Sequence, residues 1–183
     1  MPEQRILLLG VGNLLYADEG VGVHAARHLE RNYTFSGNVT LLEGGTRGRL
    51  LMGSIADCDR LVVMDAVLGG GPPGALYRLE DDDLRKSLGF HDSQHQVDLV
   101  DVLIGCGMMD SRPAAVVLGM EPMDWKSLRL ELSPVCAAAF PRFISEILRE
   151  LAAQGGRAFP REARRPSGEE APWGDLEKNP AAG

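Results

Sequence analysis

The chain has 183 residues and a formal net charge of −7, and 44% of its residues are hydrophobic. An acidic chain of this kind has no basic field that would hold nucleic acid or an anionic bilayer, so we expect neither as a partner. The three cysteines are scattered, the N-terminal apolar run is too short for a signal peptide, and no apolar segment reaches membrane length. These features predict a cytoplasmic protein.

Short apolar runs alternate with helical patterns along residues 1–156. Strands are predicted at 6–9, 39–42, 61–64 and 115–118, with a weaker one at 75–79. Apolar residues three or four positions apart predict helices over 20–31, 97–104 and 143–151. We expect the last helix to begin at Ser133 and kink at Pro141, unless it starts later, and to end at Gly155. The alternation predicts one α/β domain with a largely parallel, twisted sheet of about five strands.

Residues 157–183 differ in composition from the rest of the chain. Four prolines interrupt a mixture of arginine, glutamate, glycine and alanine, and apolar spacing is nearly absent. We therefore expect a flexible, Pro- and Gly-rich C-terminal tail there rather than a second domain. The Gly- and Pro-rich run at 69–74 is expected to be a surface loop whose mobility serves a large substrate.

The most informative segment runs from Gly10 to Gly22. It joins the first predicted strand to a helix through a glycine turn and then places Asp18 and Glu19 at the helix entrance. A dinucleotide fingerprint would need a third glycine at the position of Leu15, and two carboxylates would repel a pyrophosphate. The pattern therefore favours a cation over a nucleotide. A structural alternative is that Asp18 is the helix N-cap and Glu19 interacts with the helix dipole.

Asp65 and His95 are candidate partners of Glu19. Asp65 follows a buried strand, so it lies at the sheet edge where open α/β folds bind ligands, unless it is only a turn or cap carboxylate. Ser93 and Gln96 form a capping box that puts His95 in a first helical turn, where the dipole favours a neutral imidazole. Two oxygens and one nitrogen suit Zn, Ni or Fe better than Mg or Ca. A first-turn histidine that faces solvent is the alternative.

Two further features near this edge have competing interpretations. His24 and His28 are four positions apart and could clamp a metal on one helix face, but without an adjacent glutamate a solvated pair is favoured. The turn after the second strand contains Gly44, Gly45 and Thr46, whose backbone N–H groups could bind a carbonyl of a substrate peptide. A plain tight turn between strand and helix explains these residues equally well.

Five motifs occur in order between about residue 5 and residue 151. They are Gly10-Val11-Gly12-Asn13 with Asp18-Glu19-Gly20, Glu43-Gly44-Gly45-Thr46, Met64-Asp65-Ala66, Ser93-Gln94-His95-Gln96 and Gly119-Met120-Glu121-Pro122. In this order they resemble the motifs of the nickel-iron hydrogenase maturation endopeptidases. The resemblance implies a three-layer α/β/α fold and a protease that removes a short C-terminal extension from the precursor of the hydrogenase large subunit after nickel insertion.

The same resemblance implies roles for individual residues. Matched motif by motif, Glu19, Asp65 and His95 are the metal-contacting and catalytic residues, and the nickel arrives with the substrate rather than with a resident organic cofactor. A water molecule is then the expected nucleophile, with Glu19 or Asp65 as its base. The resemblance assigns no role to the residues after Arg157.

Three other functions are compatible with the sequence. A nucleotide-binding α/β oxidoreductase would bind NAD or FAD, and a non-catalytic nickel metallochaperone would bind metal without cleaving a precursor. A cysteine hydrolase would use Cys106 or Cys136. This last function is disfavoured because neither cysteine lies in the motifs.

Overall fold

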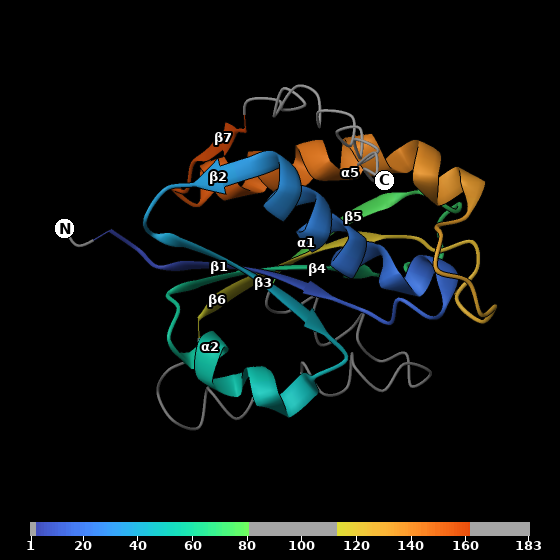
Figure 1. The fold of residues 1–183 in the computed structure, drawn as a ribbon, viewed down its shortest axis with the longest axis horizontal. Coiled ribbons are helices and arrows are strands. Elements are labelled where there is room, and N and C mark those ends of the chain that lie inside the picture. The colour runs from blue at the N-terminus through green and yellow to red at the C-terminus, as the bar shows by residue number, and fades with distance from the viewer. Residues whose placement is uncertain (1–2, 81–112, 162–183) are drawn as a thin grey trace, which may run out of the picture.

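The computed structural model describes residues 3–80 and 113–161, which form a five-stranded sheet in the order β3–β1–β4–β6–β5 (Figure 1). Four strands are parallel, and β5 runs antiparallel to β6 at one edge. All five predicted strands are confirmed. Their bounds are β1 Ile6–Val11, β3 Val39–Gly45, β4 Arg60–Ala66, β5 Leu76–Glu80 and β6 Ala114–Met120.

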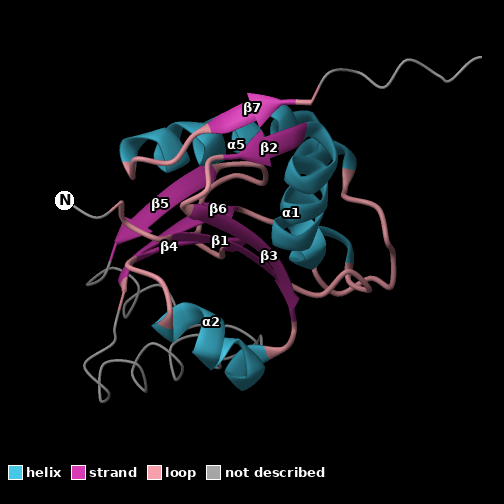
Figure 2. Cartoon of the chain, turned by 60° about the vertical axis from the view of Figure 1, so that its left-hand side comes forward, coloured by secondary structure: helices cyan, strands magenta, loops and turns pink. Residues whose placement is uncertain are grey.

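Helices cover both faces of the sheet (Figure 2). On one face lie α1 (Val21–Asn32) and α5 (Pro134–Ala153), and on the other lies α2 (Met52–Ala56). The turns of 3-10 helix η1 (Ala17–Gly20) and η2 (Gly48–Leu51) lead into α1 and α2. This arrangement confirms the predicted α/β fold with three layers.

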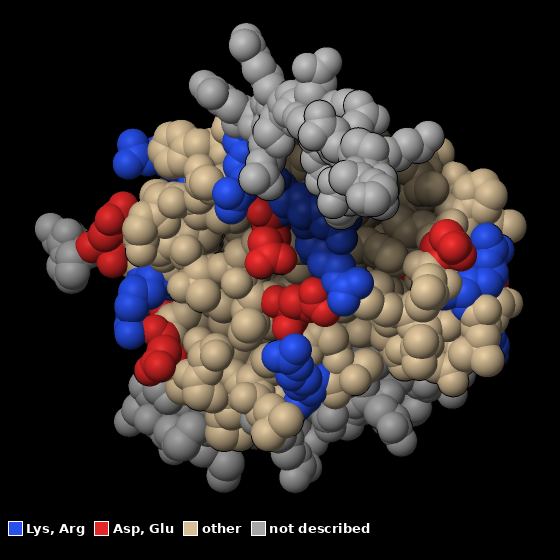
Figure 3. Space-filling model, in the orientation of Figure 1, with Lys and Arg blue, Asp and Glu red and all other residues tan. Residues whose placement is uncertain are grey.

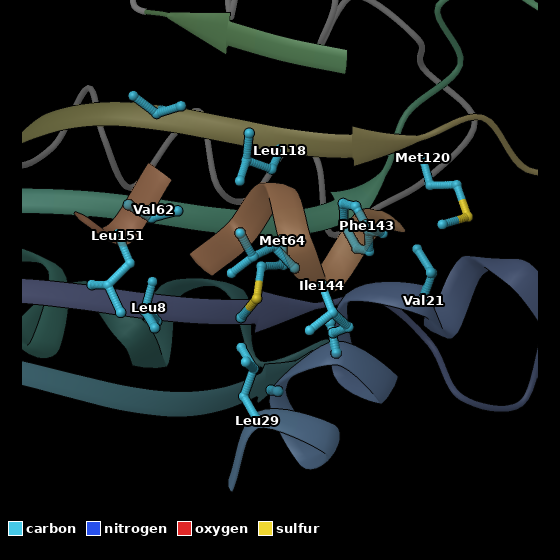
Figure 4. Packing of buried hydrophobic residues seen from close by; sticks show 14 of the residues in the cluster. Leu8, Val21, Leu29, Val62, Met64, Leu118, Met120, Phe143, Ile144 and Leu151 are labelled. Atoms are coloured by element: carbon cyan, nitrogen blue, oxygen red, sulfur yellow. The ribbon is translucent and has the colours of Figure 1, made fainter. Parts of the chain in front are cut away.

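Two apolar clusters, one on each face, hold the layers together. Successive residues of a strand point to opposite faces, so each parallel strand contributes to both clusters. The cluster under α1 and α5 includes Leu8, Leu29, Val62, Met64, Leu118, Phe143 and Leu151 (Figure 4). The cluster under α2 includes Leu7, Leu9, Ile55, Val63 and Val117. Burial on both faces explains why unbroken apolar runs mark these strands in the sequence.

Helix α5 begins where the sequence predicts. The hydroxyl of Ser133 accepts a hydrogen bond from the backbone N–H of Cys136 at 3.4 Å, and Pro134 occupies the first turn. Pro141 lies inside the helix, which continues to Ala153, so the alternative of a later start is wrong. The predicted helix over 97–104 lies outside the described residues. Across residues 3–80 and 113–161, no helix combines the length and apolar character needed to cross a membrane.

The structure also contains a small two-stranded sheet that the sequence does not predict. In it, β2 (Tyr33–Phe35) pairs antiparallel with β7 (Ala158–Pro160). Arg161 then donates its backbone N–H to the carbonyl of Asn32 at 2.7 Å. The folded part of the chain therefore extends at least to Arg161, beyond the boundary at residue 157 where the tail was expected to begin.

Candidate active site

The carboxyl ends of β1 and β4 place Glu19 and Asp65 at the same edge of the sheet. Gly10 of β1 is the register partner of Met64 of β4, and Asp65 follows Met64 directly. The chain that leaves β1 turns back into η1, which carries Glu19 and contacts β4. This edge is the one at which the sequence predicts both residues.

Three glycines let helix α1 approach the strands closely. A side chain on Gly22 would clash with the carbonyl oxygen of Met64, and one on Gly10 would clash with the carbonyl of Gly22. Gly12 has a φ of +127°, and a side chain there would clash with the carbonyl of Glu19. The glycines of this motif are thus required for packing, and they hold η1 against the ends of the strands.

Asp18 is a structural anchor and not the N-cap of α1. Helix α1 is preceded by Gly20 and has no side-chain cap, which makes the N-cap interpretation wrong. The Asp18 carboxylate is fully buried and accepts hydrogen bonds from the backbone N–H groups of Met123, Asp124 and Ser133 at 2.7–3.0 Å. Burial alone would raise the pKa of Asp18, but these hydrogen bonds outweigh it and lower the pKa. The residue therefore stays ionised and ties η1 to the segment between β6 and α5.

Glu19, the next residue, has the opposite electrostatic character. Its side chain is half-buried, and burial raises its pKa above the usual value for a glutamate. A carboxylate with a raised pKa binds protons or a cation more readily than an ordinary surface glutamate does. Of the two adjacent acids, Glu19 is therefore the one suited to chemistry.

Asp65 is almost completely buried near the end of β4. Its exposed fraction is 2%, and its Oδ1 accepts a hydrogen bond from the backbone N–H of Ala66 at 2.8 Å. Its register partner in β6 is Gly119, which has no side chain, beside the end of β4. A buried acid at the carboxyl end of a central strand is a common arrangement for a ligand or catalytic group in α/β folds.

The histidine pair on α1 has structural partners. His24 lies within hydrogen-bond distance of the carbonyl oxygen of Leu130, with Nε2 at 3.0 Å, and burial lowers its pKa. His28 contacts the ring of Phe140 edge-on, with ring centroids 5.8 Å apart. Both side chains are half-buried, so the expected solvated pair is only partly exposed to solvent, and each ring has a partner elsewhere in the chain.

The turn after β3 lies beside the glycine turn after β1. The carbonyl of Gly45 accepts a hydrogen bond from the N–H of Gly12 at 3.1 Å, and the carbonyl of Gly44 accepts one from Arg47 at 3.2 Å. Gly45 has a φ of +56°, and Thr46 is exposed. The tight-turn interpretation describes this geometry well, and the proposed substrate-binding role of these residues stays a prediction.

The predicted third site residue, His95, lies outside the described residues, as do its capping box and Cys106. Within residues 3–80 and 113–161, no group of three His, Cys, Asp or Glu side chains has an arrangement that could hold a metal. The structure therefore describes two of the three residues of the predicted set, Glu19 and Asp65.

Residues 23–150 match the family model of the hydrogenase maturation proteases. The chain is 42% identical over 134 residues to a hydrogenase expression/formation protein of Thiocapsa roseopersicina, covering 72% of this chain and 61% of the relative. It is 37% identical over 156 residues to a protein of the same name from Rhizobium leguminosarum bv. viciae, covering 84% of this chain and 77% of the relative.

A solved structure has the same fold. The hydrogenase maturating endopeptidase HybD from E. coli superposes with a TM-score of 0.81 at 33% identity, covering 86% of this chain and 98% of that one. The chain belongs to the hydrogenase maturation protease family. This membership confirms the family resemblance of the motifs and leaves the nucleotide-binding oxidoreductase without support.

One acidic residue of this family member has a role that the sequence does not reveal. Glu121 is buried, and its Oε2 accepts hydrogen bonds from the N–H of Gly69 at 2.8 Å and from the hydroxyl of Tyr77 at 2.6 Å. The Tyr77 hydroxyl also accepts a hydrogen bond from the N–H of Gly71 at 2.9 Å. The run at 69–74, expected to be mobile, is therefore tied to the body of the protease. An acid in a motif directly after a buried strand is the only sequence signal of this anchor.

The described cysteines of the protease are poor candidates for a nucleophile. Cys58 and Cys136 are buried free thiols. Burial raises the pKa of Cys136, which disfavours the reactive thiolate, and its Sγ lies 3.5 Å from the carbonyl of Glu121. The geometry of Cys136 therefore agrees with the expectation that it is not catalytic.

Proposed function

We propose that this protease removes the C-terminal extension from the precursor of a nickel-iron hydrogenase large subunit after nickel has been inserted. The observation that carries the proposal is the pair of acids, Glu19 and Asp65, at the carboxyl ends of adjacent strands in a member of this family. The name of one relative refers to a hydrogenase maturating endopeptidase. The nickel-bearing precursor is our inference for the present chain.

The proposed ligand set suits a nickel ion that the substrate carries. Two carboxylates and one imidazole, from Glu19, Asp65 and His95, would supply two oxygen ligands and one nitrogen ligand to a borderline divalent ion and leave coordination positions for the precursor. The chain then needs no resident organic cofactor, because the metal enters and leaves with the substrate. In this proposal the nickel ion marks a precursor as ready for processing and polarises the scissile carbonyl.

The protein residues would supply the proton transfers of peptide hydrolysis. The oxygen of a water molecule attacks the carbonyl carbon while a carboxylate accepts the water proton, and the C–N bond breaks as the amine nitrogen gains a proton. Glu19 is the better base because burial raises its pKa toward neutrality. Asp65 is better placed to contact the metal, since its Oδ1 is already oriented by the N–H of Ala66.

The turn at Gly44, Gly45 and Thr46 is proposed to bind the substrate peptide. It lies beside the turn at Gly12, and apart from the adjoining residues of the chain no heavy atom lies within 4 Å of the position that a Cβ of Gly45 would take. A peptide strand could therefore approach the backbone there. We also propose a cytoplasmic location, with neither nucleic acid nor a membrane as partner, in keeping with the net charge of −7.

The function is tested by incubating the purified protein with the nickel-loaded large-subunit precursor and measuring the mass of the products. The wild type should shorten the precursor at its C-terminus, whereas Glu19→Gln and Asp65→Asn should each reduce the rate by about 10²- to 10⁴-fold. His28→Ala is a matched control on the same side of the sheet and should retain activity. An unchanged precursor, together with tight nickel binding, would favour a metallochaperone instead.

A further inference from the structure

Four large apolar side chains gather beside the turn that carries Glu19. Among residues 3–80 and 113–161, seven large hydrophobic side chains are exposed, and four of them belong to two adjoining segments. We call these four the apolar rim: Leu15 (56% exposed), Met123 (54%), Leu128 (75%) and Leu130 (60%). Single exposed leucines are ordinary, but a group of them on one surface marks an interaction site.

Hydrogen bonds hold the two segments of the apolar rim together. The N–H of Arg129 donates to the carbonyl of Leu15 at 3.0 Å, and the N–H of Ala17 donates to the carbonyl of Arg129 at 2.8 Å. The N–H of Asp18 donates to the carbonyl of Asp124 at 2.9 Å, and the Asp18 carboxylate binds the same segment. The surface is thus fixed before a partner arrives, which reduces the entropy lost on binding.

The charges around the apolar rim cancel. Asp124 and Glu131 are acidic and Lys126 and Arg129 are basic, so residues 123–131 have no net charge. In Figure 3 the right-hand end, where the strands of Figure 1 lead into these turns, shows acidic and basic side chains next to each other within a largely uncharged surface. A highly charged partner such as nucleic acid would gain little binding free energy from this surface. The apolar surface of a folded protein would gain more, because binding removes apolar area from water.

We propose that the apolar rim is the docking surface for the folded body of the large-subunit precursor. Leu15 lies four residues before Glu19 in the segment that joins β1 to α1, and Met123 donates its N–H to the neighbouring Asp18. A protein that brings its C-terminal segment to Glu19 therefore lies over this surface. The inference rests on the proposed function and adds to it the chemistry of the partner contact: apolar, preformed and separate from the reacting residues.

The test is a steady-state comparison of wild type, Leu128→Glu and the double variant Leu128→Ser, Leu130→Ser, with the nickel-loaded precursor as substrate. Loss of one or two leucines that the precursor would cover should raise KM about tenfold or more and leave kcat within about twofold. Phe159→Glu is the matched control, because Phe159 is also exposed but lies on β7, away from this edge. Its KM should match that of the wild type.

The outcomes separate the docking surface from the proposed function. If the wild type cleaves the precursor and the leucine variants keep the wild-type KM, the docking surface is wrong while the protease function stands. If Leu128→Glu instead converts a dimer to a monomer by light scattering with KM unchanged, the apolar rim is a contact between two copies and the inference also fails. If the wild type does not cleave at all, the proposed function itself fails.

Discussion

Two regions of the molecule each contain a buried carboxylate that is stabilised in a different way. One is the edge of the sheet that carries Glu19 and Asp65, and the other is the contact between β5 and α5. Asp18 has no exposed surface, and its carboxylate accepts hydrogen bonds from three backbone N–H groups of a distant segment. Glu150, 6% exposed, accepts hydrogen bonds from the guanidinium of Arg78 at 2.7 and 3.1 Å and from Gln154 at 2.6 Å. An acid bound by backbone amides fixes the course of a loop, whereas an acid bound by arginine fastens one element to another.

This difference has a consequence for Glu19. Burial raises the pKa of Glu19, whereas hydrogen bonds from backbone N–H groups lower the pKa of its neighbour Asp18. Within this one motif, Asp18 therefore has a structural role, and the adjacent Glu19 is the candidate for a chemical role. At Glu150 there is no such division, because the arginine that lowers its pKa also completes the contact.

The largest expected effect concerns the double variant Glu19→Gln, Asp65→Asn. If both acids serve one metal-dependent step, the first substitution removes most of the activity and the second adds much less than its own single effect. Cleavage rates of the nickel-loaded precursor measured over the full cycle of single and double variants test this. Fully additive losses would show that the two acids act in separate steps.

Replacing the two buried anchors should separate stability from activity. Asp18→Asn places an amide N–H opposite backbone donors and should lower the free energy of unfolding by about 2–4 kcal/mol. It should also slow cleavage about tenfold, because η1 and Glu19 lose their anchor. Glu150→Gln should cost about 1–2 kcal/mol and leave kcat and KM unchanged. Urea unfolding measures the stability of the two variants, and cleavage assays measure their activity. An equal loss of kcat in Asp18→Asn and Glu150→Gln would contradict this prediction.

Acid pH should affect these carboxylates in opposite directions. The lowered pKa values of Asp18 and Glu150 mean that their stabilisation is present at neutral pH and is lost as the pH falls below about 4. The raised pKa of Glu19 means that its ionisation costs stability as the pH rises through its folded value. Glu19→Gln should therefore be more stable than the wild type at pH 7 and equal to it near pH 3. Urea unfolding of both proteins at the two pH values measures this. A Glu19→Gln variant that is less stable than the wild type at pH 7 would contradict the prediction.

The smallest effect is expected at Cys136. Its Sγ lies near the carbonyl of Glu121 in the anchor of the 69–74 segment, and a serine hydroxyl can donate to the same oxygen. Cys136→Ser should cost about 1 kcal/mol or less and keep the cleavage rate within about twofold. A folded Cys136→Ser protein without activity would restore the cysteine hydrolase.

The sheet could be predicted because its information is local. Each central strand is an apolar run buried on both faces, and Ser133 with Pro134 marks the start of α5 within a few residues. The small sheet of β2 and β7 could not be predicted, because each strand has three residues and the pairing joins segments more than 120 positions apart.

The site was predicted only as far as single motifs allow. The turn after β1 and the end of β4 identify Glu19 and Asp65, since both follow apolar strands. The roles of Asp18 and Glu121 depend on partners that lie 105–115 and 44–52 residues away, respectively, so a local N-cap was the simplest interpretation of Asp18. Sequence patterns reveal which acids lie at an edge, and the tertiary hydrogen bonds of Asp18 and Glu121 show that these two acids are anchors.

The most direct test of the account compares cleavage of nickel-loaded and nickel-free precursor by the wild-type protein. Both precursors are prepared in the same way, and the release of the C-terminal peptide is followed by mass spectrometry. We predict rapid cleavage of the loaded precursor and at least a hundredfold slower cleavage of the free one, because Glu19 and Asp65 then have no metal to bind. Equal rates for the two precursors would contradict the claim that these acids recognise a metal carried by the substrate.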